Sequence, residues 1–577
     1  MIPGTNAAFA PFRLAARWPL RIPLVRLSLL GSGWIALMLP GVPAVAQVRA
    51  AGGGQSLGTR VNGVAGGACS AGLCEVSGGT RADRNLFHRF SMFDTRGGIS
   101  GVTIRNGAAR NVIVGVTDPL GSFIDKPVSL ASRGNLVWLS PGGVALSGAG
   151  GFREVARLNL STGSGQRLAH GVFDAWRTDA SQAAALTGSP VWGRMGVVND
   201  PASLAALGLT SNGNLSLSAG TLTVDESLLL DAQGGNVVLQ AAGLQAVGGQ
   251  VELNGQQLTL NQASVDVSDP AGPGGSITVT GDAIALLGSS LRADGGAGGG
   301  QILVGGDERG SNPAVPNARL LSADAASSLQ ADGIGAANGG RVILYSKEIT
   351  TVDAALTARA GLQGGDGGFV ETSGGYLSVG SVPDLSAPQG RGGEWLIDPW
   401  NIEIVDPTPT PTLGITSGSA VLPTPTPSGA TAYISTGSIV SAFGTASVVT
   451  LSTAALGAGG SGSGTITLSS PLSFSAVPST ATLRLQAEDK IVLNANIAGP
   501  VSSPGIDVEL AAPNGVTWNS VGVSGAVWVS AKMAPSSVSA DGKISVSGAS
   551  GGFQATQLNA GSLVLSPGAQ FQLGPNS

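Results

Sequence analysis

The stretch Gly299-Gly300-Gln301-Ile302 shows the pattern that decides the fold: two glycines, one variable residue, and the start of a short apolar strand. Six further copies lie between residues 234 and 395. They are Gly234-Gly235-Asn236-Val237, Gly248-Gly249-Gln250-Val251, Gly274-Gly275-Ser276-Ile277, Gly339-Gly340-Arg341-Val342, Gly367-Gly368-Phe369-Val370 and Gly392-Gly393-Glu394-Trp395. From one second glycine to the next, the chain advances by 14, 26, 25, 40, 28 and 25 residues.

A recurring advance of this size is typical of stacked supersecondary units. Short strands joined by Gly-rich corners predict an all-β fold, a right-handed parallel β-helix or single-stranded β-solenoid. Each coil would contribute two or three strands, such as those at 237 to 240, 276 to 279 and 341 to 345, with alternate side chains stacked inward. The 40-residue advance predicts an insertion at 305 to 317 that leaves the coil as a loop.

Composition favours the same fold class. Of 577 residues, 91 are glycine and only 11% are charged. Long helices need runs of good helix formers at a 3.6-residue spacing, and beyond the first forty residues we find none that lasts three turns. Helical bundles and doubly wound folds therefore fit poorly, whereas the abundant Val, Ile, Leu, Thr and Ser favour strands.

The amino terminus has the organisation of an export signal. Four arginines precede an apolar run at 27 to 39, and Ala44-Val45-Ala46 provides a small-x-small cleavage site. We expect residues 1–46 to be a signal peptide and Gln47 to begin the mature chain. The alternative, a membrane anchor, needs about twenty uninterrupted apolar residues. Since this run is shorter and no comparable run follows it, we expect no transmembrane helix in the mature chain.

Charge and cysteine content narrow the possible partners. Removing residues 1–46 deletes four arginines and changes the formal net charge from −5 to −9, which argues against nucleic acid and anionic lipid as partners. The two cysteines, Cys69 and Cys74, are close in sequence, and in an oxidising periplasm they favour a small disulfide loop. Two free thiols are the alternative. A metal site is disfavoured because soft ligands are missing nearby.

A Pro/Thr-rich segment at residues 406–428 interrupts the repeats, because proline cannot donate ladder hydrogen bonds. It predicts either a linker between domains or an insertion within one solenoid. Strand patterns resume in residues 429–577, which we expect to be further β-helix repeats. They occur at 464 to 468, 482 to 486, 490 to 494, 506 to 510 and 562 to 565.

Three motifs carry a resemblance to a known family. The first is Asn85-Leu86-Phe87-His88-Arg89-Phe90, followed by Phe93 and Gly97-Gly98, and the second is Leu139-Ser140-Pro141-Gly142-Gly143-Val144. The third pairs Gly368-Phe369-Val370-Glu371-Thr372-Ser373-Gly374 with Gly393-Glu394-Trp395-Leu396-Ile397-Asp398-Pro399. Together they resemble the filamentous haemagglutinin family, the exoproteins of two-partner secretion. In the second motif, Ser140 and Gly142 replace the family's asparagines, and Asp118-Pro119-Leu120 stands for its Asn-Pro-x-Leu form.

The resemblance implies an adhesin-like protein with a secretion domain at residues 47–210 and β-helix repeats at 211–405. It implies recognition by periplasmic domains of a dedicated outer-membrane transporter, and export as an unfolded chain. The protein would be secreted or held at the cell surface of a Gram-negative bacterium, where it binds a receptor or glycan that the sequence does not identify. The candidate secretion-motif residues are Asn85, Leu86, Phe87, His88, Phe90, Asp118, Pro119, Leu120, Ser140, Pro141, Gly142 and Gly143.

Strand alternation makes one further prediction for the first motif. Leu86, His88 and Phe90 would share one face, and Asn85, Phe87 and Arg89 the other. We expect one face to pack inward and the other to stay available.

A polysaccharide-active lyase or hydrolase is the alternative function, because β-helices also carry such enzymes. Its catalytic carboxylates would have to cluster, yet Asp294, Asp307, Asp324, Asp332 and Asp353 stand singly beside Gly or Ala turns, where Asp is favoured for structural reasons. With His170 as the only second histidine, His88 lacks co-ligands for a metal or haem. We therefore expect no catalytic, cofactor or metal site.

Overall fold

The computed structural model describes residues 47–409, 431–453, 462–475, 477, 481–499, 506–512, 516–519, 522–524, 527–531, 538–547, 552–555, 558–565 and 570–573. The predicted signal peptide at 1–46 and most of the Pro/Thr-rich segment at 406–428 lie outside these residues. The described residues belong to one compact unit, 45–577.

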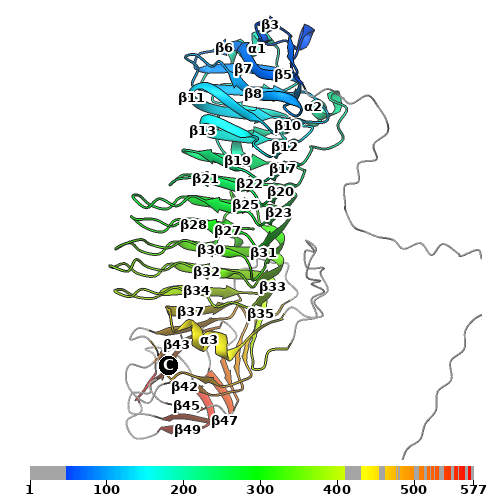
Figure 1. Cartoon of the computed structure of the whole chain (residues 1–577). Coiled ribbons are helices and arrows are strands. Elements are labelled where there is room, and N and C mark those ends of the chain that lie inside the picture. Colours follow the sequence, from blue (N-terminus) through cyan, green and yellow to red (C-terminus); the bar gives the residue numbers. More distant parts are fainter. Residues whose placement is uncertain are drawn as a thin grey trace, which may run out of the picture. The chain divides into compact units, whose positions relative to one another are not determined.

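The chain forms a parallel β-solenoid of about 15 turns, as the glycine repeat predicts (Figure 1). A regular coil has three strands, for example β17 (Leu215–Ser218), β18 (Thr221–Val224) and β19 (Ser227–Asp231). Each pairs in parallel with its counterpart one coil later. These counterparts are β20 (Val237–Gln240), β21 (Gly243–Ala246) and β22 (Gln250–Asn254).

The stacking continues along three strand columns. The first adds β23 (Gln257–Asn261), β26 (Ala283–Leu287) and β29 (Ala318–Ala323). The second adds β24 (Ser264–Asp266), β27 (Ser290–Arg292), β30 (Ser328–Gln330) and β32 (Ala355–Thr357). The third adds β25 (Ser276–Thr280), β28 (Gln301–Val304), β31 (Arg341–Val352), β33 (Phe369–Val379) and β34 (Gly393–Asp398).

The core is a stack of inward side chains, several from each coil. In the third column the register aligns Val251, Ile277, Ile302, Val342, Val370 and Trp395. All six are buried. This burial of alternate residues provides the main driving force for stacking, because it removes apolar surface from water.

A ladder of glycines marks the corner before the third strand of each coil. We call Gly249, Gly275, Gly300, Gly340, Gly368 and Gly393 the glycine ladder. A Cβ on any of the last five would lie 2.1 Å from the carbonyl oxygen of the ladder glycine one coil earlier. Only glycine therefore allows adjacent coils to approach at this corner. Gly235 lies elsewhere, at the corner before β20, so the 14-residue advance is less than one coil.

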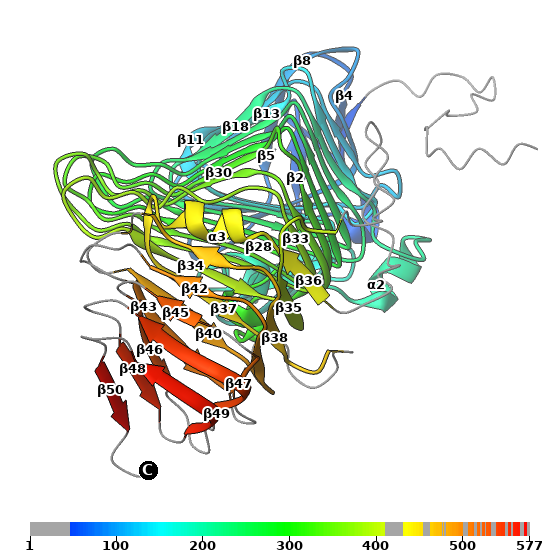
Figure 2. The same cartoon turned by 90° about the horizontal axis from the view of Figure 1, so that it is seen from below.

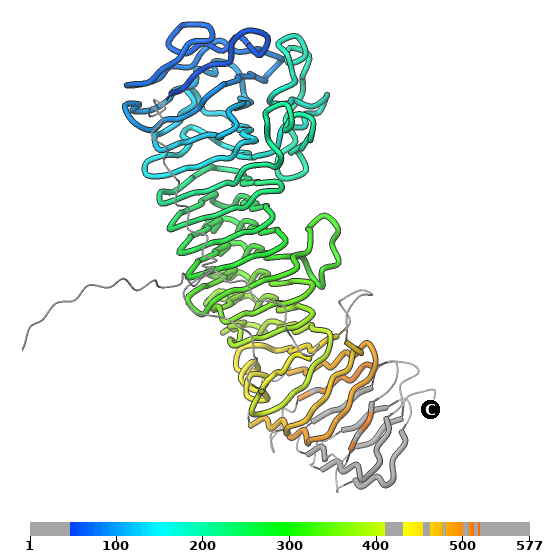
Figure 3. Tube along the Cα trace, turned by 90° about the vertical axis from the view of Figure 1, so that its right-hand side faces the viewer, coloured from blue at the N-terminus to red at the C-terminus, as the bar shows by residue number. Residues whose placement is uncertain are grey.

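The insertion at residues 305–317 leaves the coil as predicted, and part of it also packs back onto the coil surface. It contains a short 3-10 helix, η3 (Glu308–Gly310), and Val315 packs on the buried side chains of Leu303, Ile343 and Tyr345. The outward faces of β28 and β31 carry these apolar side chains, so the insertion folds back to cover them. It stands out on one side of the stacked coils (Figure 3).

The amino-terminal end departs from the simple coil. Here β1 (Val48–Ala50) pairs in antiparallel with β4 (Ala68–Cys69) and with β7 (Asn85–Asp94). On β7, β6 (Thr80–Ala82) also pairs in antiparallel. Parallel stacking runs through β5 (Ala71–Gly78), β8 (Gly98–Ile104), β9 (Asn111–Val116), β10 (Ser122–Ile124), β11 (Pro127–Leu139), β12 (Val144–Ser147) and β13 (Gly151–Ser161). Two short antiparallel strands, β2 (Thr59–Val61) and β3 (Val64–Ala65), complete this end.

Residues 162–212 leave the coil between β13 and β17, and we call them the covering segment. It holds a small antiparallel sheet of β14 (Gly165–Leu168), β15 (Gly171–Asp174) and β16 (Val197–Val198). Helices α1 (Ala180–Ala185) and α2 (Pro201–Ala206) complete it. Asp179 and Gln182 cap α1 by exchanging hydrogen bonds, which fixes the start of this short helix.

Coil stacking runs across the Pro/Thr-rich segment. β34, which precedes the segment, pairs with β37 (Ala446–Ser452), which follows it. In the same way, β35 (Asn401–Ile404) pairs across the segment with β36 (Thr431–Ile434). A third helix, α3 (Thr436–Ala442), lies between β36 and β37. Further pairings lead through β40 (Thr482–Gln486), β43 (Ile506–Ala511), β46 (Val527–Ala531), β48 (Gly552–Ala555) and β50 (Gln570–Leu573) (Figure 2).

The second sheet of these later coils contains β35 and β36 together with β38 (Ile466–Leu468), β39 (Leu472–Ser473), β41 (Ile491–Leu493), β42 (Ile497–Ala498), β44 (Val516–Trp518), β45 (Gly522–Ser524), β47 (Val538–Ser547) and β49 (Leu558–Leu565). In the described part of the chain, the helices are all too short or too polar to cross a membrane.

Candidate functional site

The Asn85–Phe90 motif occupies the first half of β7. This strand pairs in parallel with β9 and in antiparallel with β6 and β1. Its side chains alternate as the sequence predicts, but all six motif residues are buried. The prediction of one available face was therefore wrong. The reason lies far along the chain, in the covering segment, which packs on the face that carries Asn85, Phe87 and Arg89.

The inward face of β7 joins an aromatic cluster. The ring of Phe90 lies 5.2 Å from that of Phe93, and Phe93 meets Trp138 edge-on at 4.5 Å. Trp138 also contacts Phe152 at 5.5 Å. Such offset and edge-to-face pairs add stabilisation beyond the area that they bury. Through Trp138, the cluster connects the Asn85–Phe90 motif to β11, the strand that ends where the Leu139–Val144 motif begins.

His88 points to the same side as Phe90 and is fully buried. Its Nδ1 is 3.2 Å from the hydroxyl of Thr59, while its Nε2 has no partner in the described structure. Burial, with a smaller contribution from the positive charge of Arg81, lowers the pKa of His88 to about 4. The imidazole is therefore neutral near pH 7.

On the outward face, each side chain meets the covering segment. The ring of Phe87 lies 5.1 Å from that of Phe173. Asn85 donates from Nδ2 to the carbonyl oxygens of Leu186 at 3.0 Å and Gly188 at 2.7 Å. Its Oδ1 accepts from Asn111 at 2.9 Å. Asparagine is suited to this place because one amide donates twice and accepts once.

Arg89 is the most heavily bonded side chain of the motif. Its guanidinium donates to the carbonyl oxygens of Thr178 at 2.6 Å, Asp174 at 3.3 Å and Gln55 at 3.1 Å. Burial lowers the pKa of Arg89 to about 10, while the negative charges of Asp174 and Asp179 oppose that shift. The group stays charged near pH 7, and carbonyl dipoles compensate its lost hydration.

The two turn motifs stack on each other in neighbouring coils. Gly142 lies against the Asp118-Pro119-Leu120 turn so closely that a Cβ would sit 2.4 Å from the Pro119 oxygen. The Asp118 carboxylate accepts from the backbone N–H of Leu120 at 2.9 Å. Burial raises the pKa of Asp118. The Leu120 side chain is 73% exposed, which makes this turn the accessible part of the candidate set.

Hydroxyl groups tie the turns to the aromatic cluster. Ser140 donates from Oγ to the carbonyl oxygen of Gly143 at 2.8 Å and accepts from Ser122 at 3.0 Å. The indole N–H of Trp138 donates to the same Ser122 hydroxyl at 3.1 Å. Pro141 accepts on its carbonyl oxygen from Gly213. The fold thus links the Asn85–Phe90 strand and both turns through Trp138.

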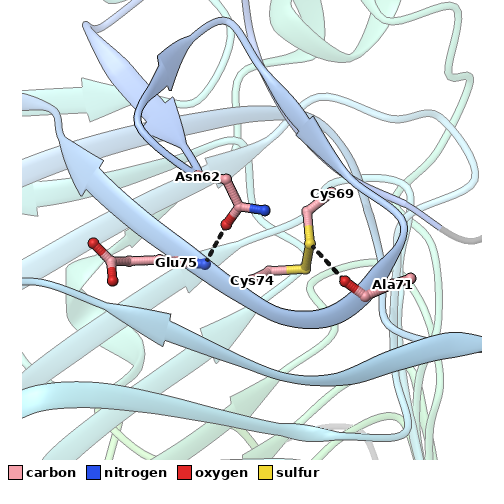
Figure 4. The surroundings of a disulfide bond; sticks show 5 residues. All are labelled: Asn62, Cys69, Ala71, Cys74 and Glu75. Carbon is pink, nitrogen blue, oxygen red and sulfur yellow. Dashed lines mark hydrogen bonds between the residues drawn. A yellow bond between two sulfur atoms is a disulfide. The ribbon is translucent and has the colours of Figure 1, made fainter.

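Cys69 and Cys74 form a disulfide at the amino-terminal end, with a Cα–Cα distance of 5.8 Å (Figure 4). Both side chains lie in the main core. Beside them, the Asn62 side chain accepts from the backbone N–H of Glu75 at 2.8 Å. The cross-link joins β4 to β5, and the hydrogen bond joins the turn between β2 and β3 to β5.

Sequence reasoning missed the covering segment and Trp138 as parts of this site. Leu168, Phe173 and Leu186 pack with Phe87 as a separate apolar cluster. Their spacing follows neither the coil repeat nor a helix, so nothing in sequence indicates which strand they cover. The signal available was an apolar segment without glycine pairs between two stretches of strand.

Four of the five aspartates considered for catalysis, Asp294, Asp307, Asp324 and Asp332, bond within the fold. Asp294 accepts from the backbone N–H of Asp332 at 2.8 Å and pairs with Arg292 at 2.7 Å. Asp332 in turn accepts from Arg359 at 2.6 Å. Asp324 accepts from the N–H of Gly288 at 2.9 Å. Among the described residues, no group of three or more His, Cys, Asp or Glu side chains is arranged to hold a metal ion.

No known family model matches the chain, and no curated protein matches it in sequence. Among solved structures, it is similar to the HMW1 secretion domain from Haemophilus influenzae at 16% identity and a TM-score of 0.31. That match covers 59% of this chain and 100% of the other.

Proposed function

We propose that this chain is an exoprotein of the two-partner secretion type, exported by a dedicated outer-membrane transporter and active in attachment to a surface. The resemblance of Asn85–Phe90 to the family's secretion signature is the observation that carries the proposal. The proposed route runs through the periplasm of a Gram-negative bacterium to its surface or the medium. The protein binds and does not catalyse.

The burial of the motif supports recognition before folding. All six side chains are covered once β7 has paired and residues 162–212 have packed on it. A transporter that reads their identity therefore has to meet the chain while these residues are unfolded. Buried Asn85 and Arg89 are bonded to carbonyls more than eighty positions later in sequence, so the signal closes only after that length has emerged.

Stacked coils suit such an export route. Each coil contacts its neighbours, so folding can propagate from one end as the chain emerges. The single disulfide spans a short loop, since Cys69 and Cys74 are 5 positions apart in sequence. A loop of that size adds little to the width of an otherwise unfolded chain.

Secretion of matched variants tests the proposal. Asn85→Ala and Phe90→Ala should accumulate in the periplasm of cells that carry the partner barrel, while Val342→Ala in the later coils is secreted. Phe173→Ala removes the neighbour of Phe87 without touching the motif. It weakens the same region, yet it should be secreted, because recognition precedes folding. Equal secretion of all four variants would contradict the proposal.

A further inference from the structure

A continuous groove follows the glycine ladder along the third strand column. Three hollows of about 390, 500 and 640 Å³ lie in sequence along it. The first two share Gly248, Gly249 and Gln250, and the last two share Gly339, Gly340 and Arg341. They therefore adjoin, and the groove runs past all six ladder glycines.

Two segments outside the regular coil border this groove. Arg194 of the covering segment donates from its backbone N–H to Glu252 at 2.9 Å and from its guanidinium to the Ala314 carbonyl at 2.5 Å. Glu308 of the insertion pairs with Arg341 at 2.8 Å. The covering segment is thus bonded to the insertion, and each of them is bonded to a strand of the third column, which forms the floor of the groove. Both segments lie on the same side of the coils (Figure 3). The covering segment also lines the first hollow, with Trp192 and Gly193.

We propose that this groove binds an extended, uncharged polysaccharide, an inference that rests on the attachment function proposed above. The glycines leave the floor free of side chains, and the residue after each glycine faces outward. The register aligns Gln250, Ser276, Gln301 and Arg341 in successive coils. Polar side chains therefore recur over these four coils with the coil spacing of about 4.8 Å, and Phe369 and Glu394 follow at the same place in the next two coils. This spacing suits a polymer of repeating units.

The side-chain chemistry favours sugar over protein. The Gln250 and Gln301 amides make no hydrogen bond within the described residues, so both can donate to and accept from hydroxyl groups. Trp192 lines the first hollow and Phe369 the last, and both residues are partly exposed. The guanidinium of Arg157 lies over the Trp192 ring at 5.9 Å, and that of Arg341 lies over the Phe369 ring at 5.2 Å. The part of each ring that remains exposed offers apolar contact to the C–H face of a sugar ring.

The charges of the groove do not select an ion. Arg157 pairs with Glu226, and Arg341 pairs with Glu308. Glu394 lies 3.5 Å from Arg484. The groove is lined by more carboxylates than guanidinium groups, so an uncharged chain fits better than a polyanion. The carboxylates are Asp225, Glu226, Glu252, Asp366 and Glu394, and the guanidinium groups are Arg157, Arg341 and Arg391.

A peptide strand cannot add to this floor. The backbone N–H groups of Ser276, Gln301 and Arg341 donate to ladder carbonyls one coil earlier, at 2.9, 3.0 and 2.9 Å. The floor therefore has no unpaired sheet edge, which β-strand addition requires.

Affinity electrophoresis of the purified chain in gels containing hydroxyethylcellulose tests the inference, with alginate as the polyanion. We expect retardation by the neutral polymer alone. Gln301→Ala should weaken binding about fivefold and Trp192→Ala about tenfold. Gln257→Ala, an exposed glutamine on β23 outside the groove, is the matched control.

The outcomes separate this inference from the secretion proposal, because export is not involved. Three results would overturn the groove assignment: wild-type retardation in both groove variants, retardation by alginate alone, or no retardation in either gel. None of them would affect the secretion experiment. Circular dichroism spectra should match wild type, and Gln301→Ala, a surface change, keeps the test valid if Trp192→Ala misfolds.

Discussion

The amino-terminal coils and the glycine-ladder coils use the same parallel stacking but control it differently. Around β7, buried polar side chains such as Asn85 and Arg89 hold a separate segment over the strand face. Along the ladder, the absence of side chains at Gly275 and Gly300 allows the coils to meet. Packing in the amino-terminal coils depends on which side chain is present, whereas contact between the glycine-ladder coils depends on the absence of a side chain. Closure by specific side-chain bonds and simple extension by coil contact are thus assigned to different parts of one solenoid.

The largest expected effect is on the ladder. Gly300→Ala places a methyl carbon 2.1 Å from the Gly275 oxygen, and the backbone must move to relieve the contact. We expect a loss of about 5 kcal/mol or more in the free energy of unfolding, since interior overpacking against backbone belongs to the severe class of substitutions. Urea denaturation followed by circular dichroism measures it.

Gly234→Ala is the matched control, because no atom lies within 4 Å of its added Cβ. It should change the free energy of unfolding by less than about 0.5 kcal/mol. If both glycine variants unfold at the same urea concentration, coil contact at the ladder does not limit stability and the contrast between the two regions fails.

The second effect concerns the amino-terminal core. Phe90→Ala empties a fully buried ring position between Phe93 and Trp138 and should cost about 3 to 5 kcal/mol. The ladder counterpart Val342→Ala removes less volume and should cost about 1 to 3 kcal/mol. Denaturant midpoints of the two variants, measured on the same chain, compare the packing of the two regions directly.

Sequence predicted the two regions unequally, for physical reasons. Glycine pairs and alternating strands repeat locally, so the parallel solenoid and strands such as Val237–Gln240 follow from the pattern alone. The cover over Asn85 and Phe87 depends on Leu186 and Phe173, which are remote in sequence and have no period. The alternation of β7 was predictable. The burial of both its faces was not, because it comes from tertiary packing.

A fall in pH and a rise in pH should each lower the stability of the fold, but through groups in different regions. His88 has its pKa lowered to about 4 by burial, so its contribution is present above about pH 6.5 and is lost as the pH falls toward 4. Glu371 has its pKa raised to about 8 by burial, with further raising by the charges of Asp398 and Glu308. Its contribution is present below about pH 4.5 and is lost as the pH rises through 8.

Single variants separate these two responses. Glu371→Gln should flatten the fall in thermal midpoint between pH 4.5 and 8, and His88→Gln should flatten the fall between pH 6.5 and 4. Each variant should leave the other limb of the profile unchanged, because the groups lie in different regions. A profile in which both variants keep both limbs would show that other groups control the pH dependence.

The smallest effect is the one that distinguishes a specific bond from simple burial. Asn85→Ala deletes donors that reach Leu186 at 3.0 Å and Gly188 at 2.7 Å, and it leaves the Asn111 amide without its acceptor. The expected cost is about 1 to 3 kcal/mol, because these groups stay buried without partners. Asn236→Ala, at a coil corner where the structure gives the side chain no hydrogen bond, should cost less than about 0.5 kcal/mol.

Protease digestion localises the effect: cleavage within residues 162–212 should rise in Asn85→Ala and stay at the wild-type level in Asn236→Ala. Equal protection in both variants would mean that apolar packing around Phe87 holds the segment by itself, and that Asn85 is kept for another purpose than closing the fold.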